Sequence, residues 1–200
     1  MDIDTFKVED FFPYYLTQEQ KTGLADAFRQ FSPDSNIYTD LFATEILQGD
    51  CWENVPYFDY NSSQTRKVKG VILSNSCDID QDNKRDLPVN VTFAPLVSFD
   101  KYKAALENSQ NLSRESIDQK LNAIKEQRIT SLIFFPAGAS LLEDCIAVLD
   151  SVFSLPLKLF LQEKPEHKNF TLNQLGHFLF AFKLSIHYCR LHEGHQKIFM

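Results

Sequence analysis

The chain has 200 residues, of which 44% are hydrophobic and 13% aromatic, so one folded domain with a buried core is expected. Its formal charge of −7 excludes the positive field of a general nucleic-acid coat, although a local basic site remains compatible with it. No run of apolar residues is long enough for a membrane span and the acidic N-terminus does not fit a signal peptide, so we expect a cytoplasmic protein.

The N-terminal third is predicted to hold one helix and one irregular strand. Thr17-Gln18-Glu19-Gln20 fits a capping box, and apolar residues then recur at helical spacing, which predicts a helix over about Gln18 to Phe31. The aromatic stretch from Leu41 to Tyr60 is interrupted by Gly49 and Pro56. This pattern is typical of an irregular strand that enters a sheet or barrel.

Two strands are predicted in the middle of the chain. Val68 to Ser74 is a β-branched run that ends in turn-forming residues, and Val89 to Ala94 alternates apolar and polar side chains until Pro95 interrupts it. We predict that they are antiparallel neighbours. Val71 and Leu73 should then lie on one face, and Ile72 on the other.

The C-terminal half is predicted to contain a helical insertion, two short strands and a long helix. Residues 100–128 are polar and helical, with an apolar stripe on one face. Leu132 to Phe135 and Ile146 to Val152 read as strands, and Leu175 to Leu191 reads as a helix that Thr171 or Asn173 caps.

We expect one structural domain with three parts. They are an N-terminal helical segment (1–40), a β-barrel-like core with the helical insertion (41–160) and the C-terminal helix (161–200). The expected fold class is therefore α+β.

Several short motifs resemble the MazF/PemK family of toxins. In that family a Gly-Asp pair starts the first strand, an Arg precedes a strand of the form VLVIS, and a later strand reads VAPLTS. The matching residues here are Gly49-Asp50, Arg66, Val71 to Ser74, and Val91 to Ser98. The position after Ala94-Pro95-Leu96 is Val97, where the family has Thr or Ser, and Ser98 follows one place later.

The resemblance covers roughly Gly49 to Ser98 and implies a small SH3-like barrel of bacterial or phage type. It implies a protein that binds or cleaves RNA in a toxin-antitoxin or phage-defence setting. Arg66 is the candidate for stabilising phosphate charge, with Lys67 and Lys69 adding local positive charge. The alternative is that these three residues form a basic surface loop.

A second group of candidate residues follows the predicted strand. Five polar or reactive side chains crowd into seven positions, where a loop exposes functional groups; they are Ser74, Ser76, Cys77, Asp78 and Asp80. Asp50 and Cys51 would approach them if the Gly49-Asp50 strand pairs alongside. We take Asp78, with Arg66, as the catalytic candidates and the others, with Asp50, as binding candidates. The alternative is that Cys77 is a buried small hydrophobe and Asp78 a turn or cap residue.

Metal and cysteine chemistry are less favoured. The four cysteines form no CxxC pair, and Asp78 beside Cys77 would raise the pKa of that thiol rather than activate it. His187, Cys189, His192 and His195 are the densest group of potential ligands, but we interpret them as a polar helix end. No metal and no other cofactor is predicted.

Two function classes remain. The first is a MazF/PemK-like barrel that binds or cleaves RNA. The second is a noncatalytic interaction module with a degenerate barrel, which docks a protein partner encoded nearby. A basic concave surface that contains Arg66 beside Ser74 to Asp78 would favour the first. A large exposed apolar patch on the C-terminal helix would favour the second. Whether the chain is an enzyme, and its oligomeric state, are left open.

Overall fold

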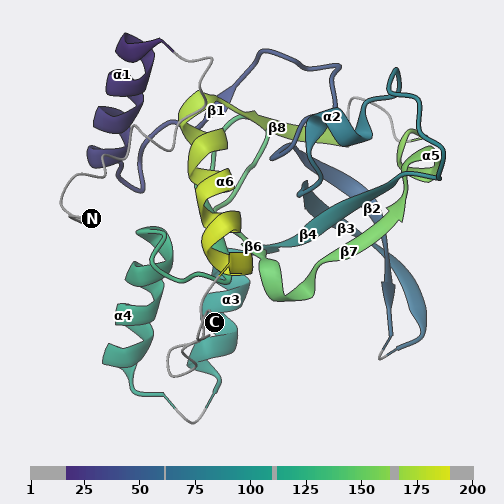
Figure 1. Cartoon of the computed structure of the whole chain (residues 1–200). Coiled ribbons are helices and arrows are strands. Elements are labelled where there is room, and N and C mark those ends of the chain that lie inside the picture. The colour runs from purple at the N-terminus through teal and green to yellow at the C-terminus, as the bar shows by residue number, and fades with distance from the viewer. Residues whose placement is uncertain (1–16, 61, 110–111, 163–166, 190–200) are drawn as a thin grey trace, which may run out of the picture. The chain divides into compact units, whose positions relative to one another are not determined.

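The computed structural model describes residues 17–60, 62–109, 112–162 and 167–189, and the chain divides into two compact units between Ser35 and Asn36 (Figure 1). The first unit contains one described helix, α1 (Gln18–Arg29). The helix predicted to run to Phe31 therefore ends at Arg29, shortly before Ser32-Pro33. The N–H of Gln30 still donates to the carbonyl of Asp26 at 3.0 Å, and the restriction that Pro33 places on Ser32 prevents any longer continuation of the helix.

The second unit is built on one antiparallel sheet, which confirms the mixed α+β class (Figure 1). The strand order is β1-β8-β2-β3-β4-β6-β5, and β7 also pairs with β4. The sheet is open, because the strands at its two ends, β1 and β5, do not pair with each other. The strands are β1 (Tyr38–Thr39), β2 (Cys51–Asp59), β3 (Gln64–Ile72), β4 (Asn90–Ser98), β5 (Leu132–Phe135), β6 (Cys145–Val148), β7 (Phe153–Pro156) and β8 (Lys168–Leu172).

Side chains nevertheless connect the two ends of the sheet. The Tyr38 hydroxyl on β1 donates a 2.6 Å hydrogen bond to the carbonyl of Pro136, which directly follows β5. The rings of Tyr38 and Phe135 both pack against Phe170 on β8, with centroid distances of 4.8 and 5.1 Å. The sheet is therefore strongly curved although its backbone ladder does not close.

The predicted pairing of the two central strands is confirmed. β3 and β4 are antiparallel, with Val71 opposite Ala94 and Ile72 opposite Phe93. Ile72 and Phe93 are both fully buried in one apolar cluster, as expected for residues directly opposite each other on one face. Leu73 extends the pairing by one bond, since its N–H donates to the carbonyl of Thr92 at 2.8 Å.

The prediction that Pro95 interrupts this ladder was wrong. Pro95 lies inside β4 opposite Gly70. Thr92 directs its carbonyl and N–H toward the β3 side, so by alternation Pro95 directs its nitrogen toward the other side. On that side β7 pairs with β4 up to Phe93, and β6 pairs from Leu96 onward. The proline thus occupies the gap between two partner strands, where no N–H is required.

The predicted helical insertion is confirmed and consists of α3 (Phe99–Glu107) and α4 (Arg114–Lys125). The stripe of Ile117, Leu121 and Ile124 is buried in a cluster with Phe134 of β5 and Ile146 of β6. The segment predicted as a strand up to Val152 is shorter, because β6 ends at Val148 and a 3-10 turn, η3 (Leu149–Ser151), follows.

The last elements are two short helices and the C-terminal helix. They are α2 (Ser76–Ile79), α5 (Leu157–Phe160) and α6 (Gln174–Cys189). Asn173 caps α6, since its side-chain oxygen accepts from the N–H of Gly176 at 2.9 Å, while Thr171 lies in β8. His192, His195 and the predicted helix end at Leu191 lie outside the described residues. None of the helices that the structure describes is long and apolar enough to cross a membrane.

Candidate functional site

The two predicted serines are used by the backbone around α2. The hydroxyl oxygen of Ser74 accepts a 2.9 Å hydrogen bond from the N–H of Thr92, which extends the pairing of β3 with β4 beyond Ile72. The hydroxyl oxygen of Ser76 accepts a 2.9 Å bond from the N–H of Gln48. Both serines therefore position neighbouring segments, as side chains at the ends of strands and helices commonly do.

Asp78 is accessible, as a functional carboxylate should be, but its partner is not one of the predicted residues. Its side chain is 68% exposed and forms a 2.8 Å ion pair with Arg85. The expectation that Asp78 lies close to Asp50 or Arg66 finds no supporting contact in the structure. Cys77 is exposed, so the interpretation of this thiol as a buried small hydrophobe was wrong.

Three of the predicted residues, Ser76, Cys77 and Asp80, line one cavity of about 430 Å³. One wall of the cavity is formed by residues 76–82, in and after α2. The opposite wall belongs to residues 41–49, which run from β1 toward β2 and which we call the strap. The cavity has an acidic rim and an apolar floor, and its lining contains no Lys or Arg. The residues that line it are Thr44, Glu45, Ile46, Leu47, Ser76, Cys77, Ile79, Asp80, Gln81 and Asp82.

Asp50 does not join this cavity, because it is fully buried immediately before β2. Its Oδ2 atom accepts from the N–H of Leu47 and forms an ion pair with Lys168, both at 2.8 Å. Its Oδ1 atom has no hydrogen-bond partner in the part of the chain that the structure describes. Burial raises the pKa of this carboxyl to about 6, and the ammonium group of Lys168 acts in the opposite direction.

The buried side chain of Lys168 anchors the strap. Its Nζ donates to the carbonyls of Phe42 and Glu45 at 2.8 and 3.0 Å, in addition to the carboxylate of Asp50. All three donors of the ammonium group are therefore used. Gly49 completes the anchor with φ of +89°, in a position where a Cβ would lie 2.6 Å from Leu172. Sequence reasoning did not find Lys168, because it lies 118 residues after Asp50.

Arg66 lies elsewhere, in the distal half of the β2–β3 hairpin. Its guanidinium carbon is 5.1 Å from the ring centroid of Tyr57, and its NH2 atom is 4.0 Å from the Asp59 carboxylate. Six residues of extended strand, about 20 Å, separate it from the end of β3 at Ile72. The two catalytic candidates, Arg66 and Asp78, therefore do not form one site.

The opposite face of the same hairpin has a different composition. Pro56 pairs with Lys67 and Phe58 pairs with Thr65, so these side chains share one face, and Lys69 follows on it. The ring of Tyr60 packs edge-on against Phe58 at 4.9 Å. Phe58 and Tyr60 are 46% and 85% exposed. Neither lysine forms an ion pair with a carboxylate among the described residues. We call Phe58, Tyr60, Lys67 and Lys69 the aromatic–lysine face.

The register also places the hydroxyl that follows the APL motif. Lys69 pairs with Leu96, so Ser98 lies on the aromatic–lysine face, whereas Val97 lies on the face of Arg66. Ser98 is occupied there, since its hydroxyl donates to Glu143 at 2.6 Å and caps α3. The face of Arg66 therefore carries the apolar side chain of Val97 at the position where the MazF/PemK pattern has a Thr or Ser hydroxyl.

Two of the four cysteines, Cys51 and Cys145, are buried. Burial raises the pKa of the Cys145 thiol to about 11 and that of the Cys51 thiol well above its ordinary value, so both are protonated. Within the described ranges, no three His, Cys, Asp or Glu residues are arranged to hold a metal ion. His187 instead lies 3.7 Å from Asp150.

Comparison with known proteins does not assign the chain to a family. No family model matches the chain, and no curated protein sequence is similar to it.

Proposed function

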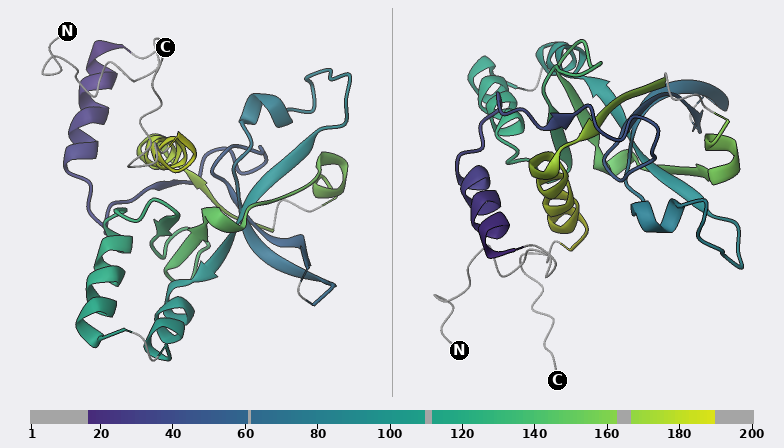
Figure 2. Two further views of the ribbon diagram at one scale, coloured as in Figure 1. Left: turned by 60° about the horizontal axis from the view of Figure 1, so that its bottom comes forward. Right: turned by 90° about the horizontal axis from the view of Figure 1, so that it is seen from above.

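We propose that the chain binds single-stranded RNA on the aromatic–lysine face of the β2–β3 hairpin and does not cleave it. The observation that carries the proposal is the register of the hairpin, which gathers two exposed rings and two lysines on one face. Single-stranded nucleic acids are bound by rings that stack on bases and by cations that follow the phosphates. The hairpin also projects from the rest of its unit (Figures 1 and 2), and Phe58, Tyr60 and Lys67 are exposed on it.

The same geometry argues for binding without cleavage. Arg66 is stacked on Tyr57, lies beside the Asp59 carboxylate and shares its face with Val97. Metal-free cleavage would need a general acid or base, and that group would have to lie within hydrogen-bond reach of the scissile phosphate. We infer a degenerate relative of the MazF/PemK barrel, in which curvature is retained and the ladder is open. The resemblance suggests a toxin-antitoxin or phage-defence setting in a bacterium or phage.

The experiment is fluorescence anisotropy with an unstructured, labelled RNA of about 15 nucleotides, a length that covers the usual site size of a single-strand-binding surface. Because stacking contributes about 1 to 3 kcal/mol per base, Phe58→Ala or Tyr60→Ala should each raise Kd by about 5- to 150-fold. Arg66→Ala and Asp78→Asn should change Kd less than about twofold, since both side chains lie away from this face. The RNA should remain intact on a denaturing gel.

Two outcomes would overturn this proposal. The first is unchanged affinity in both aromatic variants, provided that circular dichroism shows them folded. The second is cleavage of the RNA by the wild type that Arg66→Ala abolishes, because that result would restore the catalytic interpretation of Arg66.

A further inference from the structure

The cavity between the strap and α2 has features that the hairpin lacks. Its floor contains Ile79, which is 2% exposed, and Ile46, which packs against the same apolar cluster. Its rim carries the exposed carboxylates of Glu45, Asp80 and Asp82. We call this cavity the acidic groove. Its volume of about 430 Å³ lies within the range of about 300 to 1,000 Å³ that is typical of binding pockets.

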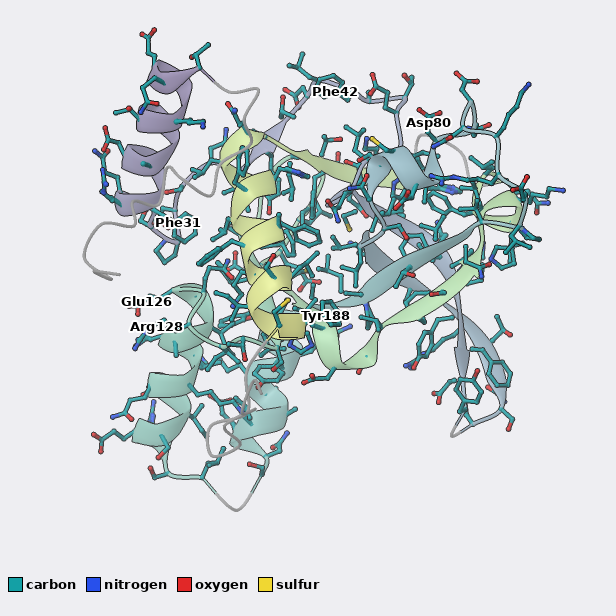
Figure 3. The ribbon with its side chains drawn as sticks, viewed as in Figure 1. Phe31, Phe42, Asp80, Glu126, Arg128 and Tyr188 are labelled. Atoms are coloured by element: carbon teal, nitrogen blue, oxygen red, sulfur yellow. The ribbon has the colours of Figure 1, made fainter. Side chains whose placement is uncertain are left out.

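Two apolar side chains are presented to solvent on the same strap. Leu41 and Phe42 are 66% and 49% exposed. Figure 3 shows Phe42 and Asp80 along the same edge of the molecule. Phe42 has φ of +64°, a left-handed conformation that is unfavourable for a bulky residue. The bond from Lys168 to the carbonyl of Phe42 holds this conformation, so Phe42 is directed outward by a buried anchor.

The walls of the acidic groove are fixed before any partner arrives. Ser76 binds the backbone of Gln48, and the Gln48 side chain donates to the carbonyl of Leu73 at 2.8 Å. The strap and α2 are therefore joined directly. A surface that is ordered in advance loses little conformational entropy on binding, which favours its use as a docking site.

We propose that the acidic groove, together with Leu41 and Phe42, docks a basic, apolar segment of a protein partner. The apolar floor and the two exposed side chains accept apolar residues, and the three carboxylates on the rim accept Lys or Arg. Nucleic acid does not fit here, because the rim would repel phosphates. This surface is separate from the aromatic–lysine face and does not depend on RNA binding.

The test uses three labelled synthetic peptides of about 15 residues, a length that one docked segment would span. The first has Leu at helical spacing and Lys elsewhere; the second replaces Lys by Glu, and the third replaces Leu by Ser. Binding is measured by anisotropy. Cys77 lines the groove, so its reaction with a maleimide reports occupancy. The experiment uses the variant Cys189→Ser, because Cys51 and Cys145 are buried and Cys77 is then the one exposed thiol of the four cysteines.

Of the three peptides, we expect only the Lys/Leu peptide to bind. At saturation it should slow the modification of Cys77 by about fivefold or more, because it occupies the groove. The pair Asp80→Asn and Asp82→Asn should raise its Kd by about tenfold, and Phe42→Asn should also weaken it. Asparagine tolerates the backbone conformation of Phe42. The matched control, Glu115→Gln with Asp118→Asn on α4, removes the same charge elsewhere and should change Kd less than about twofold.

Each alternative outcome contradicts the proposal. If the Lys/Leu peptide does not bind, or binds without slowing Cys77 modification, the acidic groove is not its site. If the Lys/Ser peptide binds as tightly, or the α4 control weakens binding as much as the groove pair does, the attraction is general charge rather than docking. Melting curves establish that each variant is folded.

Discussion

Replacing Lys168 by Met should be among the most damaging single changes in the second unit. Removal of one partner of a buried ion pair typically destabilises a protein by about 3 to 5 kcal/mol, out of a total of about 5 to 15 kcal/mol. Here the loss leaves Asp50 buried with no countercharge. Its Oδ1 atom has no hydrogen-bond partner among the described residues even in the wild type, so little else can compensate. It also leaves the carbonyls of Phe42 and Glu45 without the lysine that anchors the strap.

The effect should depend on pH in a defined direction. The pKa of Asp50 is raised from 3.8 to about 6, so the folded state binds this proton more tightly than the unfolded state. The stability contributed by this proton is fully present below pH 4 and is lost as pH rises through 6, by an amount on the order of 3 kcal/mol. Without Lys168 the pKa should rise further. The loss in Lys168→Met should therefore be larger at pH 8 than at pH 5.

Urea unfolding at pH 5 and pH 8 measures both effects. The double variant Asp50→Asn with Lys168→Met removes the buried charge, and the asparagine can still accept from Leu47. This double variant should be more stable than Lys168→Met alone at pH 8, and its loss should be nearly independent of pH. A loss below about 1 kcal/mol in Lys168→Met at pH 8 would refute the account of the anchor, because surface pairs contribute that little.

Two further predictions concern the loop between α4 and β5, which contains Gln127 and Ile129. The Gln127 amide bonds both the carbonyl and the N–H of Phe134, at 2.7 and 3.1 Å, so Gln127→Asn, which is too short to reach, should lose about 1 to 3 kcal/mol in chemical unfolding; an unchanged midpoint would exclude this role. On α6, the buried Nζ of Lys183 donates to the carbonyls of Gln127 and Ile129. Burial lowers the pKa of this ammonium group from 10.5 to about 8, so the unfolded state binds that proton more tightly. Wild-type stability should therefore rise between pH 8 and 10 relative to Lys183→Met, and parallel pH profiles would contradict the assignment.

The parts of the fold that could be predicted from the sequence depend on local patterns. The β-branched run before Ser74 and the alternating run from Val89 were sufficient to predict neighbouring antiparallel strands, because each strand has a clear period. The stripe at Ile117, Leu121 and Ile124 likewise predicted the insertion helix. Pro95 could not be interpreted correctly, because its tolerance depends on which strands lie on its far side, and these follow about 50 residues later.

The candidate site was less predictable, because its geometry is set by contacts that are distant in sequence. The crowding of polar residues after Ser74 predicted exposed functional groups there, whereas the cavity that Ser76, Cys77 and Asp80 line was not predicted. The sequence did not reveal that Asp50 is buried against Lys168. It also did not show that Arg66 and Ser98 lie on opposite faces, because a shift of β4 by one residue against β3 would have placed both on the same face.

The salt dependence of RNA binding tests the central claim most directly. Each lysine that neutralises a phosphate of a single strand contributes about −0.7 to the slope of log K against log salt. If Lys67 and Lys69 contact the RNA, the double variant Lys67→Gln with Lys69→Gln should reduce the magnitude of that slope by about 1.4, a loss that the control Lys101→Gln with Lys103→Gln on α3 should not reproduce. An unchanged slope in the hairpin variant, or an equal change in the control, would contradict the assignment of RNA binding to the aromatic–lysine face.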